Sequence, residues 1–257
     1  MGKLLTLGLC LTVLACQAGH AFSSFDAEGG SVHGAILREA LRGTVSNTNI
    51  EFMIAACNSQ DLPDSDWLKE SRRHFDDGNF AGALAYIDRE KRRALNYAGD
   101  ADTDPDNRAR CLRHFALVLH TVQDFYSRSN YVELLLEDPR NQVNPYNVAL
   151  VDWVKVPEGY IGSRSGSCLQ SGMRSGATIA NNVSYAELNK DNVDSPEGKR
   201  LAGGVAYFKV ARDLALRETV RQWNLFEALI RSRYLRRSEA IIAALKAASP
   251  GGVAESD

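Results

Sequence analysis

The stretch LRHFALVLHTVQDFYSRSNYVE, residues 112–133, decides the fold because it joins a long apolar run to two polar side chains one helical turn apart. The run from Phe115 to Leu119 predicts a buried helix, and His120 and Asp124 lie on one face of it. An imidazole and a carboxylate are costly to bury unless they pair or bind a metal ion. Zinc sites often use two ligands one turn apart. From these residues alone, a metal site and a structural His–Asp pair both remain open.

Helix signals on both sides of this stretch predict an all-α fold, a multi-helix bundle. Asp104–Pro105, an N-cap followed by a proline at N1, begins the helix that carries the stretch. Ser195–Pro196 repeats that signal before a second long helix, expected over residues 197–233. The other expected helices follow Ser31, span residues 49–56, follow Asn79 and follow Ser238. Between the two long helices, residues 139–194 are rich in Gly, Ser and Asn and predict a long irregular insertion at the surface, with a strand or a packed extended segment over residues 148–156.

The first residues have the pattern of a secretory signal peptide, residues 1–21. Lys3 precedes an apolar run that is too short to span a bilayer. Gly19 and Ala21 place small residues at −3 and −1 of a cut after residue 21. Cys16 ends an imperfect lipobox, which makes a lipoprotein the alternative to simple secretion. The sequence therefore predicts a secreted or periplasmic protein.

Composition is that of a folded domain, with a net charge of −2, 44% hydrophobic and 24% charged residues. This balance shows no basic footprint for nucleic acid. Removal of the signal would leave Cys57, Cys111 and Cys168, an odd number that sets no disulfide framework. We expect one helical domain, residues 22–249, followed by a disordered tail, residues 250–257.

The few remaining histidines point to a dispersed set of ligands. His33 lies on the inner face of the first expected helix, and His74 stands beside carboxylates just before another helix. Asp61 lies thirteen positions before His74. His114 points to a different side of the helix from His120, so we do not expect it to be a ligand.

The central motif resembles the signature of the HET-C family, named for the fungal heterokaryon-incompatibility protein C. The pattern His-x-x-x-Asp-Phe-x-x-x-Ser-Asn-x-x-Glu is made here by His120, Asp124, Phe125, Ser129, Asn130 and Glu133. Weaker echoes extend the resemblance from His33 to about Phe226. HET-C proteins are similar to the helical zinc-dependent phospholipases C and single-strand-specific zinc nucleases, so the resemblance implies a bundle of the zinc-dependent phospholipase C type.

The resemblance also implies a zinc centre and a reaction. Carried over position by position, the metal ligands are His33, Asp61, His74, His120 and Asp124, joined by the amine of Phe22 if the signal is cut after residue 21. Asp61 would in addition orient or deprotonate the attacking water. The implied substrate is a phosphodiester, with phospholipid head groups first, and a membrane surface is the implied place of action.

The sequence departs from the family pattern in two places. Arg128 stands where HET-C-like sequences usually carry a histidine, and it can pair with Asp124 at i,i+4. No histidine follows His120. The further metal ligands would then have to be carboxylates or amides, and the candidates are Asp76, Asn130, Glu133, Asp191 and Glu218. We therefore expect one or two zinc ions rather than three, with no metal as the alternative. The predicted function is an exported metal-dependent phosphodiester hydrolase; the alternative is a catalytically reduced HET-C-like protein that acts at membranes or in recognition between cells without hydrolysis.

Overall fold

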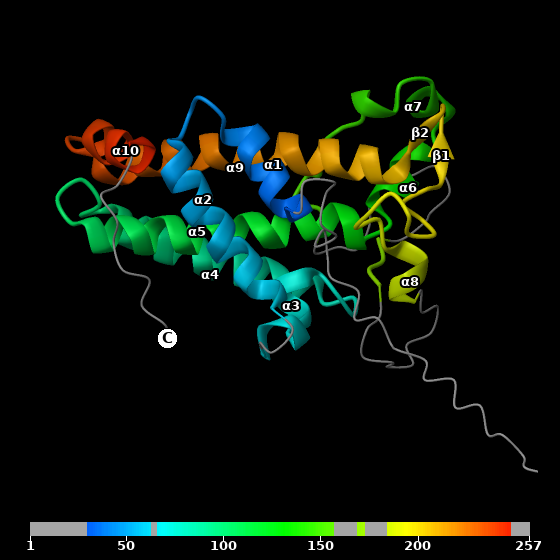
Figure 1. The fold of residues 1–257 in the computed structure, drawn as a ribbon, viewed down its shortest axis with the longest axis horizontal. Helices are drawn as coiled ribbons and strands as arrows, with labels where there is room; N and C mark the ends of the chain where they lie inside the picture. The colour runs from blue at the N-terminus through cyan, green and yellow to red at the C-terminus, as the bar shows by residue number, and fades with distance from the viewer. Residues whose placement is uncertain (1–29, 63–65, 157–168, 173–183, 248–257) are drawn as a thin grey trace, which may run out of the picture.

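The computed structural model describes residues 30–62, 66–156, 169–172 and 184–247 (Figure 1). The predicted signal peptide, Phe22, Cys168 and the predicted tail lie outside the described residues, as do both expected limits of the domain. What is described is mostly helical and confirms the all-α prediction. None of the helices in these ranges is long and apolar enough to cross a membrane.

The described elements comprise helices, three short 3-10 turns and one small hairpin. The helices are α1 (Val32–Leu41), α2 (Asn47–Asn58), α3 (Ser71–His74), α4 (Phe80–Ala98), α5 (Pro105–Arg128), α6 (Tyr131–Leu136), α7 (Pro139–Val143), α8 (Tyr185–Leu188), α9 (Tyr207–Tyr234) and α10 (Ser238–Lys246). The 3-10 turns are η1 (Ser59–Asp61), η2 (Asp66–Lys69) and η3 (Pro145–Asn147), and the antiparallel hairpin pairs β1 (Leu201–Ala202) with β2 (Val205–Ala206).

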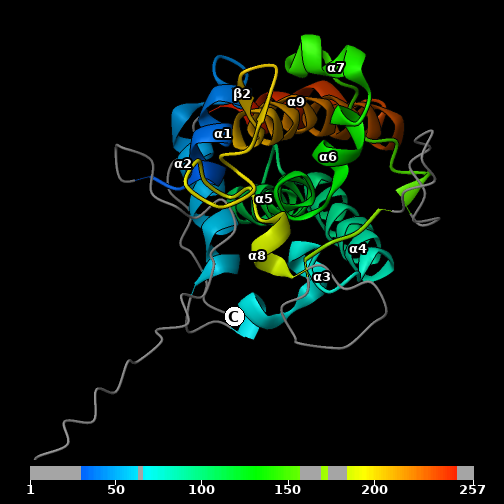
Figure 2. The ribbon, with the colours of Figure 1, turned by 90° about the vertical axis from the view of Figure 1, so that its right-hand side faces the viewer.

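Helix α5 is the centre of the bundle. Seen end on in Figure 2, it lies in the middle, and it packs against α4, α9, α2 and α3. The Asp104 carboxylate accepts hydrogen bonds from the backbone N–H groups of Asp106 and Asn107, so the predicted cap is present. Every residue from 115 to 128 is buried, which confirms the buried helix and forces its polar side chains to find partners inside the protein.

The second long helix begins later than predicted. α9 starts at Tyr207 rather than at residue 197, so that part of the prediction is wrong. Gly203 and Gly204 have φ of +53° and +80° and make the two-residue turn of the β1–β2 hairpin. Such a turn requires positive φ, which glycine adopts without a steric penalty. Ser195 caps a turn instead, with its Oγ accepting from the Gly198 N–H.

The described parts of the predicted insertion cover the C-terminal end of α5. Residues 148–152 form neither a helix nor a strand, Val148 has an extended backbone, and Val148 and Val151 are buried, which fits the packed-segment alternative. The Gly172 N–H donates to the Arg128 carbonyl at 3.1 Å, and the Asp77 N–H donates to the Gly172 carbonyl at 2.9 Å. Residues 169–172 therefore join the end of α5 to the loop that follows α3.

Candidate metal centre

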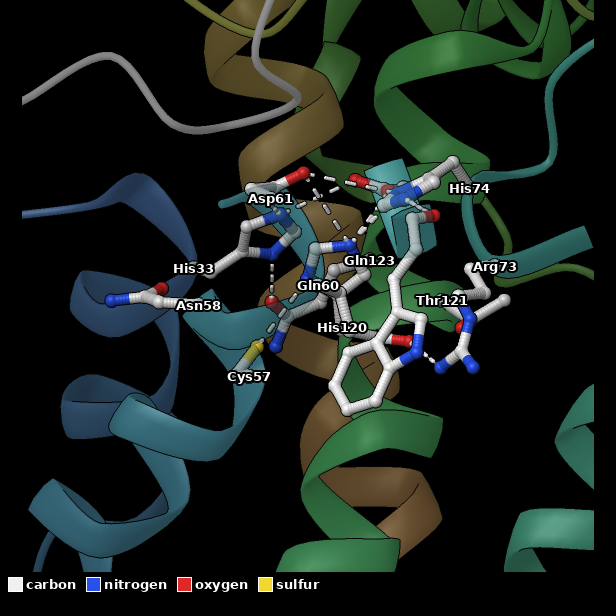
Figure 3. A network of polar contacts seen from close by, with 12 residues as sticks. His33, Cys57, Asn58, Gln60, Asp61, Arg73, His74, His120, Thr121 and Gln123 are labelled. Atoms are coloured by element: carbon white, nitrogen blue, oxygen red, sulfur yellow. Dashed lines mark hydrogen bonds and ion pairs between the residues drawn. The ribbon is translucent and has the colours of Figure 1, made fainter. Parts of the chain in front are cut away.

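The five side chains predicted as metal ligands meet in one buried cluster at the middle of the bundle. His33 comes from α1, Asp61 from η1, His74 from the end of α3, and His120 and Asp124 from α5. Figure 3 shows the three imidazoles and Asp61 turned toward one another. The exposed fraction is 8% for Asp61 and 0% for the other four. Four separate segments of the chain thus bring nitrogen and oxygen donors to one place.

Three donor atoms form a compact triangle at the core of the cluster. Asp124 Oδ2 lies 2.9 Å from His74 Nδ1 and 3.1 Å from His120 Nε2, and the two nitrogens are 3.0 Å apart. Zinc bonds to nitrogen and oxygen are about 2.0–2.1 Å, so two ligands of a tetrahedral zinc ion lie about 3.3 Å apart. The triangle is close to one face of such a tetrahedron.

Both carboxylates lie between His33 and the other two imidazoles. Asp124 Oδ1 is 3.3 Å from His33 Nε2, while the other oxygen of Asp124 faces His74 and His120. Asp61 is arranged likewise, with Oδ2 3.7 Å from His33 Nε2 and Oδ1 3.8 Å from the nearest nitrogens of His74 and His120. Oδ1 of each carboxylate accepts no hydrogen bond from the described residues. Buried carboxylate oxygens without hydrogen-bond donors are what a cation site offers.

A 3-10 turn positions Asp61 at the edge of this cluster. Its neighbour Gln60 is fully buried and donates from Nε2 to the carbonyl of Leu117 on α5, at 3.3 Å. The same amide accepts from Arg73 Nη1 at 3.2 Å. These bonds hold η1 against α5, so the more exposed Asp61 faces the triangle from outside.

A glutamine that the sequence argument missed sets the orientation of His33. Gln123 Nε2 donates to Thr219 Oγ1 at 2.9 Å, so its Oε1 is the atom 2.7 Å from His33 Nδ1 and must accept a proton from it. The Nε2 of His33 then carries the lone pair and faces the two carboxylates. Metal-binding histidines are commonly fixed in this way by an outer hydrogen bond. Its signal in the sequence is an amide inside an apolar helix.

We expect Gln123→Leu to weaken zinc binding by about 10–100-fold, the usual effect of losing such an outer partner. Gln123→Glu keeps an acceptor for the His33 Nδ1–H and is the matched control, with affinity closer to that of the parent protein. Competition against a chromophoric chelator measures both. An unchanged zinc affinity in Gln123→Leu would show that this bond does not orient a ligand.

Arg128 is a fully buried cation beside the cluster. Its Nη1 donates to Asp76 Oδ2 at 2.7 Å, and its Nη2 lies 3.7 Å from Asp124 Oδ2 and 3.8 Å from Asp61 Oδ1. The predicted i,i+4 pairing with Asp124 is therefore present, but Asp76 is the closer partner. Among these four side chains, three carboxylates face one guanidinium.

The loop that carries Asp76 is in an uncommon conformation. Phe75 and Asp77 have φ of +53° and +58°, in the left-handed region that costs a non-glycine residue roughly 1–2 kcal/mol. Phe75 is held there by ring contacts with Phe125 and Trp153. The packing therefore sustains a strained backbone that places the Asp76 carboxylate on Arg128.

Burial and neighbouring charges shift the pKa values of the side chains in the cluster in different directions. Burial lowers the pKa of His120 to about 4, against the charges of Asp124 and Asp61, so its ring is neutral at pH 7. Burial disfavours the charged form of His33 too, but a protonated ring would donate to Asp124 and be stabilised by the charges of Asp124 and Asp61, so the pKa of His33 is raised overall. Burial raises the pKa of Asp61, whereas in Asp124 Arg128 and His120 outweigh burial and hold the pKa well below its usual range. Neutral imidazole and ionised carboxylate are the forms that bind metal.

A cysteine also belongs to the cluster, although the sequence analysis did not include it among the candidate ligands. Cys57 is fully buried, its Sγ lies 3.7 Å from His120 Nδ1, and neither it nor Cys111 forms a disulfide. Its signal in the sequence is its position four residues before Asp61. By contrast, His114 pairs with Glu90 at 2.7 Å, on the α4 side of α5, as expected of a histidine outside the ligand set.

The structure also locates the additional candidates. Glu133 Oε1 pairs with Lys190 at 2.7 Å, and the Glu218 carboxylate accepts from Tyr126, Trp153 and Gln222. Asn130 Oδ1 accepts from the Gln170 N–H, and Asp191 is buried with its N–H donating to the Asn189 side chain. Asp76 acts through Arg128, as described above. The ligand set proposed below is therefore drawn from the central cluster.

Together, fold and site define an all-α protein with buried groups of His, Asp and Cys side chains that could hold a metal ion. In the part of the chain that the structure describes, two such groups have donor atoms within 4.8 Å of one another: Asp61, His74 and His120, and His33, Cys57 and His120. Comparisons with protein-family models, curated proteins and solved structures found no match. Membership of the HET-C family stays a prediction from the sequence motif.

Proposed function

We propose that this protein is an exported metal-dependent hydrolase of phosphodiesters, with one zinc ion held by Asp61, His74, His120 and Asp124 and with His33 beside them. The observation that carries the proposal is the convergence of these five side chains, from four segments of the chain, in a buried cluster. Their spacing approaches that of ligands around a tetrahedral zinc ion. The donor set suits zinc because it combines imidazole with carboxylate.

The balance of charge in the cluster supports a divalent ion. Among the described side chains of the cluster, the carboxylates of Asp61, Asp76 and Asp124 lie within 4 Å of the guanidinium of Arg128. Uncompensated negative charge is expensive to bury, and a divalent cation would neutralise it. Arg128 lies at the side of both ligand carboxylates, where its charge opposes a further cation. This favours one ion over three.

Each residue of the cluster would have its own role in the proposed hydrolysis. A bound zinc ion supplies a water of lowered pKa and positive charge for phosphate oxygens. Asp61 is the most exposed member of the cluster and burial raises the pKa of its carboxyl, which suits it to accept a proton from the attacking water. Asp124, kept ionised by Arg128 and His120, stays a ligand. The Gln123 hydrogen bond keeps the His33 Nε2 directed at the carboxylates.

A phosphodiester is the substrate class that the HET-C-like motif around His120 and Asp124 favours. The net charge of −2 supplies no extended basic surface for a nucleic acid. Recognition of phosphate would therefore depend on the centre itself. Phospholipid head groups are the first class to test, at a membrane surface.

A second candidate function is a HET-C-like protein that acts at membranes or in recognition between cells without hydrolysis. The observation that favours it is Arg128, fully buried and within 3.8 Å of both Asp61 and Asp124. A guanidinium there compensates part of the negative charge without any metal. In this alternative the cluster stabilises the bundle.

The two functions are separated by metal content and activity measured on the same sample. We expect the purified protein to bind about one zinc per chain and to hydrolyse phosphatidylcholine vesicles or bis(p-nitrophenyl) phosphate. A chelator should abolish this activity and added zinc should restore it. Asp61→Asn is the control that keeps the side-chain size but removes the base.

Each result decides between the candidates. Zinc bound without hydrolysis of either substrate supports the second function. Less than one zinc per chain, with no activity before or after zinc is added, contradicts the metal-dependent hydrolase.

A further inference from the structure

Cys57 faces the side of the His120 ring that the proposed zinc ligands leave unused. His120 Nε2 faces Asp124 and His74, whereas its Nδ1 lies 3.7 Å from Cys57 Sγ. Figure 3 shows Cys57 below the ring and Asp61 and His74 above it. The donor atoms of His33, Cys57 and His120 all lie within 4.8 Å of one another.

The distance between sulfur and nitrogen fits a shared metal ligand sphere. Zinc lies about 2.3 Å from a thiolate and about 2.0–2.1 Å from an imidazole nitrogen, so these two ligands are about 3.5 Å apart around a tetrahedral ion. The 3.7 Å between Cys57 Sγ and His120 Nδ1 is close to this value. His33 completes the group because its ligand atom lies within 4.8 Å of those of Cys57 and His120; the Nε2 of the His33 ring faces the carboxylates of Asp61 and Asp124. Asp124 Oδ1, buried and without a hydrogen-bond donor among the described residues, is 3.3 Å from that Nε2.

We propose that His33, Cys57 and His120 form a second, sulfur-containing metal position that takes a thiophilic divalent ion. The proposal rests on the proposed metal centre because both positions use His120. When the Sγ–metal bond forms, the thiol proton leaves to solvent. Nδ1 of His120 then supplies the lone pair to the metal, and its Nε2 carries the proton, next to Asp124.

The two positions exclude each other through this one ring. A neutral imidazole has a single lone pair for a metal, on one nitrogen or the other. An ion among Asp61, His74 and Asp124 takes His120 Nε2, and an ion beside Cys57 takes Nδ1. A thiophilic ion therefore withdraws His120 from the hydrolytic set, and the protein discriminates between ions by their affinity for sulfur.

Cadmium is the probe because it binds thiolate strongly. The metal-free protein is loaded with one equivalent of Cd²⁺ and X-ray absorption at the cadmium edge identifies the ligand atoms. We expect a sulfur ligand in the parent protein and its complete loss in Cys57→Ser. Cys111→Ser is the matched control, a buried cysteine on α5, and should keep the sulfur ligand. His74→Gln should keep it too, because His74 belongs only to the other position.

A second variant keeps the test decisive if Cys57→Ser does not fold. In it, Cys10, Cys16, Cys111 and Cys168 are all replaced by serine, so that a thiolate ligand can come only from Cys57. Cadmium bound through nitrogen and oxygen alone would overturn this inference while leaving the proposed hydrolase standing. A sulfur signal that persists in Cys57→Ser would overturn it as well.

If no metal binds, both proposals fail. A sulfur signal that depends on Cys57, in a protein without hydrolytic activity, supports the metal position and contradicts the hydrolase.

Discussion

Replacing His120 with alanine is expected to weaken zinc binding by more than about 100-fold, since even the loss of an outer partner costs 10–100-fold. His120 Nε2 is one corner of the triangle with Asp124 Oδ2 and His74 Nδ1. Its removal deletes a ligand and leaves the Asp124 carboxylate with a weaker set of partners. Hydrolysis should disappear with the metal. Zinc per chain and chelator competition on the purified variant measure the first effect.

His114→Ala is the matched control for this prediction. It removes a histidine from the same helix that pairs with Glu90 instead of the cluster, so zinc content should not change. If His120 and Asp124 were only a structural pair, His120→Ala would lower the free energy of unfolding by roughly 1–3 kcal/mol and leave the metal content unaltered. That outcome would contradict the metal centre.

The second large effect is expected from Arg128→Met, which should lower the free energy of unfolding of the metal-free protein by about 3–5 kcal/mol. Methionine keeps much of the volume but removes the charge that faces Asp76, Asp124 and Asp61. Three buried carboxylates would then lack their cation. Urea unfolding in the presence of a chelator measures the loss. Bound zinc should recover part of it, because the metal supplies positive charge to the folded state alone.

The exposed pair of Arg38 and Glu51 provides the control for the Arg128 prediction. These side chains are 45% and 53% exposed, so Arg38→Met should change stability by less than about 1 kcal/mol. Adding Asp76→Asn to Arg128→Met should return part of the lost stability, since one of the buried carboxylates that faced Arg128 is then replaced by a neutral amide. A loss below about 1 kcal/mol in Arg128→Met would show that its charge is not needed to balance the carboxylates.

The sequence by itself determined the features that depend on neighbouring residues along the chain. The Asp104–Pro105 cap, the buried course of α5 and the facing of His120 and Asp124 follow from backbone hydrogen bonding and helical periodicity, which act within a few residues. The delayed start of α9 is also a local event. The prediction began the helix at the proline that follows Ser195 and did not use the pair Gly203–Gly204, which makes the turn of the hairpin before α9.

The scarcity of histidine and the HET-C-like motif were enough to name five side chains of the central cluster, but not Cys57. No local pattern in the sequence predicted where in the fold these side chains come together. His33 and Gln123 are ninety positions apart in the sequence and share a hydrogen bond of 2.7 Å. Such contacts exist only once α1, α2, α3 and α5 have packed.

Only the tertiary structure decided what surrounds His120 and Asp124. It placed Arg128 on Asp76 through a strained loop, and it turned Cys57 toward the second nitrogen of His120. Sequence spacing places Arg128 four residues after Asp124 and Cys57 four residues before Asp61, but it gives neither the contact with Asp76 nor the contact with His120 Nδ1. Helix packing and burial select these contacts, and a buried charge requires compensation. The predicted His–Asp pair of α5 thus lies in a buried cluster that places carboxylate oxygens at Nε2 of His120 and the sulfur of Cys57 at its Nδ1.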